Sequence, residues 1–257
     1  MSMPSELPRA PVRGTTAAEA YFRANRADLG LFYFILDTVL ASDWVAHVAR
    51  QALDGNENIK DHDPTQLAQD NPGPRTKFLR RNRQSLQEMF MSRFVDNFQK
   101  YVVDLIRAVL RVRPEILSTS QQSLTLEHLL QYTRIEDLVH DIIERKVNAL
   151  SYEGFADLQK WCLDRGIPIQ VRGVDLDIVV ELVATRNIIA HNRGIVDERY
   201  IRTVPSPTFQ VNASRMFEVD DVWEALALFD RVVSETDALS IQKFGLDSVD
   251  IIVSAEP

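Results

Sequence analysis

One short segment combines residue types that suit chemistry on a phosphodiester: Arg186-Asn187-Ile188-Ile189-Ala190-His191. Arginine keeps its positive charge at physiological pH, and histidine takes up or releases a proton near neutrality. Asn187 and His191 are four residues apart and therefore share one face of a helix. A histidine in the last helical turn also lies at the negative end of the helix dipole, which favours the imidazolium. The segment thus offers a fixed cation, an amide and a proton carrier.

The spacing limits what one copy of this segment can do. Arg186 and His191 are separated so that, on a helix, they point about 140° apart and lie about 7.5 Å apart along the axis. They cannot flank one phosphate as simple helix neighbours, although the long arginine side chain can fold back. A second copy facing the first across a two-fold axis would supply a second histidine, and acid–base cleavage of RNA needs two proton-transfer groups. The segment is therefore interpreted as half of a site in a homodimer, with no metal or other cofactor required.

The motif closes a predicted amphipathic helix that begins at Asp175 and stops at Gly194. Apolar residues recurring at three- and four-residue intervals predict further helices. These span about 16–53, 76–112, 125–132, 134–150, 154–165 and 220–244. The first of them is apolar enough to be buried. Few glycines and this helical periodicity predict an all-α fold, a bundle of long antiparallel helices with an N-terminal helical extension.

The segments between the helices are predicted from their polar and turn-forming residues. Residues 54–75 carry Asp-Gly, Asn-Pro and Gly-Pro pairs and are expected to form a long loop. The segments 208–211 and 216–219 flank a short polar turn and are expected to form a small β-hairpin. The expected domain organisation is an N-terminal arm, helix and loop, a helical domain, and a C-terminal tail, over 1–75, 76–245 and 246–257.

Composition and charge narrow the class of protein. The chain has 257 residues, is 45% hydrophobic and 26% charged, and carries a net charge of -8, which argues against a protein coated with basic residues for duplex DNA. The single cysteine, Cys162, rules out an intramolecular disulfide and fits a reducing compartment. The longest apolar run, Leu29 to Leu36, is short for a membrane span, and the N-terminus lacks the pattern of a signal peptide. A cytoplasmic protein without a membrane segment is expected.

The stretch from Phe94 to Tyr200 resembles the HEPN superfamily of small helical nucleases. The resemblance rests on Ala184-Thr185-Arg186-Asn187-Ile188-Ile189-Ala190-His191-Asn192, followed by Gly194-Ile195-Val196-Asp197 and Tyr200. It is supported by Ile135-Glu136-Asp137-Leu138, Tyr152 and Phe155 in the preceding helices. The family motif is an arginine, four to six residues, and a histidine, often with a polar residue directly after the arginine. The resemblance covers about 95–245.

This resemblance implies a metal-independent endoribonuclease that acts as a dimer on an RNA substrate. Cleavage would leave a 2′,3′-cyclic phosphate and a 5′-hydroxyl. The resemblance implies His191 as general acid or base, Arg186 as the clamp on the phosphate and the transition state, and Asn187 as the group that orients His191 or a substrate oxygen. Many family members are toxins or antiphage effectors, which implies an antitoxin or another defence-system protein as partner. Other relatives are inactive scaffolds or nucleotide-binding modules, so a non-catalytic interaction subunit is the alternative.

Both functional and structural interpretations are open for the individual residues. Arg186 is either the clamp or an ion-pair partner, and His191 is either the proton carrier or a polar helix end. Asn192 and Arg193 are secondary candidates for substrate binding. Arg80 and Arg81, within a basic stretch at 75–83, either bind RNA phosphates or form a solvated helix end, which is the favoured interpretation.

Two further groups of residues are interpreted as structural. Asp61-His62-Asp63 has metal-ligand residue types but lacks the spacing of a recognisable site, and it is interpreted as surface. Cys162 stands beside Trp161 with no basic cluster to activate it, and it is interpreted as core.

Overall fold

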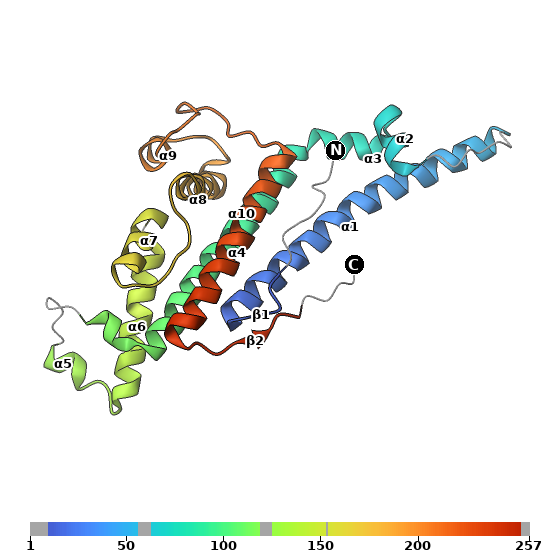
Figure 1. Ribbon diagram of the computed structural model, residues 1–257. Helices are drawn as coiled ribbons and strands as arrows, with labels where there is room; N and C mark the ends of the chain where they lie inside the picture. The colour runs from blue at the N-terminus through green and yellow to red at the C-terminus, as the bar shows by residue number, and fades with distance from the viewer. Residues whose placement is uncertain (1–9, 56–62, 119–124, 153, 253–257) are drawn as a thin grey trace.

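Helices dominate the computed structural model, which describes residues 10–55, 63–118, 125–152 and 154–252 (Figure 1). In chain order the elements are β1 (Arg13–Gly14), α1 (Thr16–Leu53), α2 (Pro64–Asp70), α3 (Pro74–Arg81), α4 (Arg83–Val112), the 3-10 helix η1 (Pro114–Leu117), α5 (Leu126–Leu129), α6 (Ile135–Tyr152), α7 (Phe155–Asp164), α8 (Val174–Asn192), α9 (Glu198–Thr203), α10 (Val219–Phe244) and β2 (Val249–Asp250). Within these ranges β1 and β2 form the only sheet. The predicted all-α fold class is confirmed.

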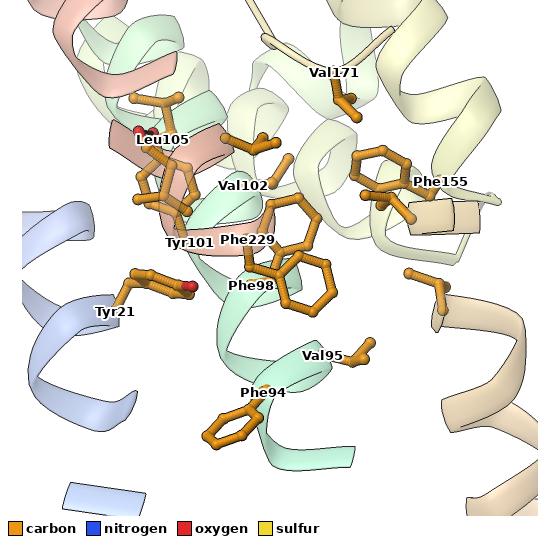
Figure 2. Close-up of a cluster of buried hydrophobic side chains, with 14 of the residues drawn as sticks. Tyr21, Phe94, Val95, Phe98, Tyr101, Val102, Leu105, Phe155, Val171 and Phe229 are labelled. Carbon is orange, nitrogen blue, oxygen red and sulfur yellow. Dashed lines mark hydrogen bonds between the residues drawn. The ribbon is translucent and has the colours of Figure 1, made fainter. Parts of the chain in front are cut away.

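The central feature of the fold is α4, which runs beside α10 with α1 on one side and α6, α7 and α8 on the other (Figure 1). The helix predicted over 76–112 is divided at Asn82 into α3 and α4. The predicted apolar stripe of α4 is buried, and Phe98 lies in the middle of it (Figure 2). Its ring stacks on Phe229 of α10 at 4.4 Å between centroids and lies 5.5 Å from Phe155 of α7. Burial of this apolar surface fixes α4 as the support for the helices around it.

Buried hydrogen bonds attach the first half of α1 to α10. The backbone N–H and the hydroxyl of Thr15 donate to Asp237 at 2.8 and 2.6 Å. The Tyr21 hydroxyl donates to Asp230 at 2.8 Å. Both aspartates are buried, and burial raises the pKa of each carboxyl group, that of Asp230 to about 6. The hydroxyl donors compensate the carboxylates for part of their lost hydration.

The second half of α1 extends past α4 and α10, which differs from the predicted burial of its apolar residues (Figure 1). Leu31, Phe34 and Val45 are 48%, 67% and 57% exposed. The helices α2 and α3 pack along this part of α1. By length and composition alone, α1 is the one helix in the described ranges that is long and apolar enough to cross a membrane, and 17% of its apolar stretch is buried. The absence of a membrane segment stays a prediction.

The predicted loop over 54–75 contains a helix, α2, and the start of α3. Asp63 caps α2 with its side chain. Asp43 of α1 accepts a hydrogen bond from the backbone N–H of Thr76 at 2.7 Å and so satisfies the first turn of α3. A Cβ atom at Gly73 would lie 2.3 Å from Cγ of Asp43, so this close approach requires glycine. The cap of α3 thus comes from a side chain of α1, and the polar composition of 54–75 gave no indication of α2.

The predicted hairpin of 208–211 with 216–219 is wrong. The segment after α9 pairs instead with the turn after α8, through an isolated antiparallel bridge between Ile195 and Ser214. The turn after α8 leaves backbone donors and acceptors without helical partners, and this segment satisfies them.

The small sheet brings two distant parts of the sequence together. β1 pairs antiparallel with β2, so that Gly14 lies opposite Val249. Residues of α1 also belong to the same hydrophobic cluster as α4 and α10. These contacts connect all three of the predicted segments, 1–75, 76–245 and 246–257, whose division stays a prediction.

Candidate active site

The helix α8 carries the Arg–His motif in its last turns and ends in a glycine turn. It begins one residue before the predicted cap, Asp175. Arg193 and Gly194 adopt left-handed backbone conformations, with φ of 54° and 74°. The N–H of Gly194 donates to the carbonyl of Ile188 at 3.0 Å, which satisfies one of the last helical acceptors. The prediction that the helix stops at Gly194 is confirmed, and the stop places His191 in the last turn.

Buried contacts hold α9 against α8. The Asp197 carboxylate accepts from the backbone N–H of Tyr200 at 2.7 Å and caps α9. The Tyr200 side chain is buried, and its hydroxyl donates to Glu181 of α8 at 3.0 Å. Burial raises the pKa of Tyr200 to about 12. A small apolar cluster joins the two helices, formed by Ala184, Ile188, Val196, Tyr200 and Val204. Side chains on α8 and α9 are therefore fixed relative to one another.

A groove of about 940 Å³ lies between α4, α7, α8 and α9. Arg186, Asn187 and His191 all line it. Arg186 and His191 start from different sides of α8, as their spacing dictates, but the long side chain of arginine reaches the same groove. One copy of the chain therefore brings the cation, the amide and the imidazole to a single groove.

Arg186 is ion-paired within this groove. Its Nε lies 2.6 Å from Oδ1 of Asp96 on α4, and the two side chains are 29% and 47% exposed. Its Nη1 donates to Oδ1 of Asn187 at 3.4 Å. The ion-pair interpretation of Arg186 is thus confirmed, and it does not exclude a phosphate, because a guanidinium has five N–H donors.

His191 is the titratable group of the motif that faces solvent. Its side chain is exposed, and it makes no hydrogen bond or ion pair with any residue that the structure describes. Asn187, one turn earlier, is half-buried. An imidazole in this position is accessible to a substrate in the groove.

Three further cations line the groove: Lys100 of α4 and Arg199 and Arg202 of α9. Lys100 pairs with Asp104 at 2.8 Å, and Arg202 pairs with Glu198 at 3.3 Å. Sequence reasoning did not select these cations. The one pattern that points to them is the three-residue spacing of Arg199 and Arg202 on the short helix after the motif, which places both on one face.

The four secondary candidates for substrate binding lie outside the lining of the groove. The Asn192 amide donates to the carbonyl of Ile195 at 2.7 Å and so stabilises the turn after α8. Arg193 is the exposed C-cap residue of α8. Arg80 and Arg81 end α3, and Arg80 donates to a backbone carbonyl of α2 at 2.9 Å. None of the four side chains lines the groove with Arg186 and His191.

No group of three histidine, cysteine or acidic side chains in the described part of the chain is placed to hold a metal ion. Of the Asp61-His62-Asp63 sequence, the first two residues lie outside the described residues. Cys162 is buried, as its interpretation as core requires. Burial raises the pKa of its thiol to about 12, so it remains protonated and unreactive at neutral pH.

No protein-family model, curated protein or solved structure matches this chain. The similarity to the HEPN superfamily stays a prediction that rests on the motif residues.

Proposed function

We propose that the groove is the active site of a metal-independent endoribonuclease of the HEPN type. The proposal includes a cytoplasmic role as a toxin or antiphage effector, held in check by a partner protein. The observation that carries it is that Arg186, Asn187 and His191 line one groove. A volume of about 940 Å³ is sufficient to admit nucleotides of a single RNA strand.

Cleavage of this type uses the ribose 2′-hydroxyl as the nucleophile. A base removes the proton of the 2′-hydroxyl, the resulting oxygen attacks the phosphorus, and the bond to the 5′-oxygen breaks. An acid protonates the departing 5′-oxygen. The products are a 2′,3′-cyclic phosphate and a 5′-hydroxyl, and no electrons or further reactants are needed.

The side chains of the groove divide these tasks by their chemistry. His191 is assigned the proton transfer, because its imidazole is exposed in the groove and has ring nitrogens that can donate or accept a proton. Tyr200 does not act as the base, because its pKa of about 12 keeps it protonated and its hydroxyl is engaged with Glu181. Arg186 stabilises the negative charge that develops on the phosphate oxygens, and Asn187 orients Arg186 or a substrate oxygen.

A homodimer is part of this proposal. The described lining of the groove contains one histidine, whereas the reaction has two proton transfers. A second copy related by a two-fold axis would contribute its own His191 to a composite cleft.

The test is cleavage of total RNA in the presence of EDTA by the wild type and by His191→Ala. His140→Ala is the matched control, because His140 is an exposed histidine on α6 that does not line the groove. We expect wild type and His140→Ala to cleave RNA equally and His191→Ala to be inactive. Equal cleavage by all three proteins, or none by the wild type, would refute the proposal.

A non-catalytic HEPN-like interaction or nucleotide-binding subunit is the second candidate. The observation that favours it is the ion pair between Arg186 and Asp96, which partly neutralises the proposed clamp, in a chain of net charge -8. Growth of cells that express the protein separates the two candidates. Growth inhibition that disappears with Arg186→Ala supports the ribonuclease, and no inhibition by either protein supports the interaction subunit.

A further inference from the structure

Arg199 differs from the other cations that line the groove. Arg186, Lys100 and Arg202 each lie within 2.6, 2.8 and 3.3 Å of a carboxylate oxygen. Arg199 makes no ion pair or hydrogen bond through its side chain with any residue in the described ranges, and it is exposed. Among the cations that line the groove, Arg199 is therefore the one that has no ion pair with a described acidic side chain.

The helix α9 presents Arg199 to the groove from a fixed position. Arg199, Arg202 and Thr203 line the groove and share one face of the helix. Tyr200, on the adjacent face, and Val204, directly after the helix, are buried against α8. Because α9 is capped and its buried face is anchored to α8, the backbone that carries Arg199 is held in place relative to His191.

The chemistry of an unpaired arginine in this setting favours a phosphate ligand. The planar guanidinium offers parallel N–H donors that match two phosphate oxygens. A phosphate that engages Arg186 fully competes with Asp96, whereas Arg199 accepts a phosphate without the loss of an existing ion pair. Arg199 is therefore the residue best placed to bind the backbone of a strand that lies along the groove.

We infer that Arg199 binds a phosphate of the RNA strand, in addition to the phosphate on which Arg186 and His191 act. The inference rests on the proposed function, because it takes RNA as the polymer in the groove. It adds a binding residue on α9 that lies outside the Arg–His motif.

The test is the salt dependence of binding to a single-stranded RNA oligonucleotide, measured by fluorescence anisotropy with His191→Ala as the parent protein, so that RNA stays intact. Each phosphate contact to a single strand contributes about -0.7 to the slope of log affinity against log salt concentration. Adding Arg199→Ala should make the slope less negative by about 0.7. The ratio of the parent's RNA affinity to that of the Arg199→Ala variant should therefore fall about 2.6-fold between about 50 and 200 mM salt.

Two further variants make this measurement specific. Arg172→Ala removes the same charge from an exposed arginine between α7 and α8, outside the groove, and should leave the slope unchanged. Arg199→Lys retains the charge and should also keep the slope of the parent. A melting temperature equal to that of the parent shows that Arg199→Ala is folded.

The outcomes separate this inference from the proposed function. A slope for Arg199→Ala equal to that of Arg172→Ala overturns the inference, even if the wild type cleaves RNA. A less negative slope that occurs only in Arg199→Ala supports the inference, even if the wild type fails to cleave RNA. If the parent protein binds no RNA at any salt concentration, the inference is overturned.

Discussion

Removal of the charge on Asp96 should tighten the binding of RNA. Asp96→Asn keeps the size and shape of the side chain but abolishes the carboxylate that lies 2.6 Å from Nε of Arg186. The guanidinium then has no charged competitor for a phosphate. The variant therefore measures how much the ion pair opposes the substrate.

The exposure of the pair sets the magnitude of this effect. The side chains of Arg186 and Asp96 are 29% and 47% exposed, so solvent screens their attraction. Ion pairs of this kind contribute about 0.2–1 kcal/mol, which corresponds to an increase in RNA affinity of about 1.4- to 5-fold. A larger increase is not expected, because the unpaired arginine is hydrated in the free protein.

The assay is RNA binding in the His191→Ala background at constant salt. Asp175→Asn is the matched control, because Asp175 pairs with Arg231 at 2.8 Å with side chains 38% and 44% exposed, outside the groove. It removes the same charge and should change the affinity less than Asp96→Asn does. Weaker binding by Asp96→Asn would refute the reasoning and would mean that the carboxylate positions Arg186 for the phosphate.

Three further predictions concern the fold that supports the site. Burial raises the pKa of Asp230 from 3.8 to about 6, so the charged carboxylate opposes folding. The charge therefore lowers the free energy of unfolding, by nothing below about pH 4 and by its full amount above about pH 6. Urea unfolding should therefore show Asp230→Asn increasingly more stable relative to the wild type as pH rises from about 4 to about 6, by up to about 3 kcal/mol, with no further change above that range. A difference independent of pH would contradict this. Asp43→Ala removes the acceptor of the Thr76 N–H and should cost about 1 kcal/mol and speed amide hydrogen exchange in α3, whereas unchanged exchange would argue against the cap. Gly194→Ala places a Cβ 3.0 Å from Glu88 at a φ of +74° and should lower the free energy of unfolding by about 1–2 kcal/mol, and an unchanged melting temperature would exclude that strain.

The sequence predicted those helices and helix ends that depend on residues close together in the chain. The periodic apolar residues of α4 and the glycine at position 194 define a helix and a helix end without reference to the rest of the chain. Most of α3 was predicted as the start of the helix over 76–112, whereas α2 and the break at Asn82 were not predicted. The cap of α3 was not predictable either, because Asp43 belongs to another helix. The supposed hairpin failed because the backbone of 212–215, which includes its predicted turn, pairs with the turn at 194–196. Local composition does not indicate this pairing.

The same distinction applies to the candidate site. The motif on α8 is continuous in sequence, so Arg186, Asn187 and His191 were recognisable as a set. Asp96 was not recognisable, because its contact with Arg186 arises from the packing of α4 against α8. The role of Arg199 depends on which face of α9 is buried, and that is decided by Tyr200 in the tertiary structure.

The most direct test of ribonuclease activity uses an oligonucleotide of deoxynucleotides that contains one ribonucleotide. The proposed reaction requires a 2′-hydroxyl, so cleavage in EDTA should occur only on the 3′ side of that ribonucleotide. It should leave a 2′,3′-cyclic phosphate and a 5′-hydroxyl, and it should be lost in His191→Ala. Cleavage at deoxynucleotide positions, a 5′-phosphate product, or an intact oligonucleotide at every protein concentration would contradict the proposed function.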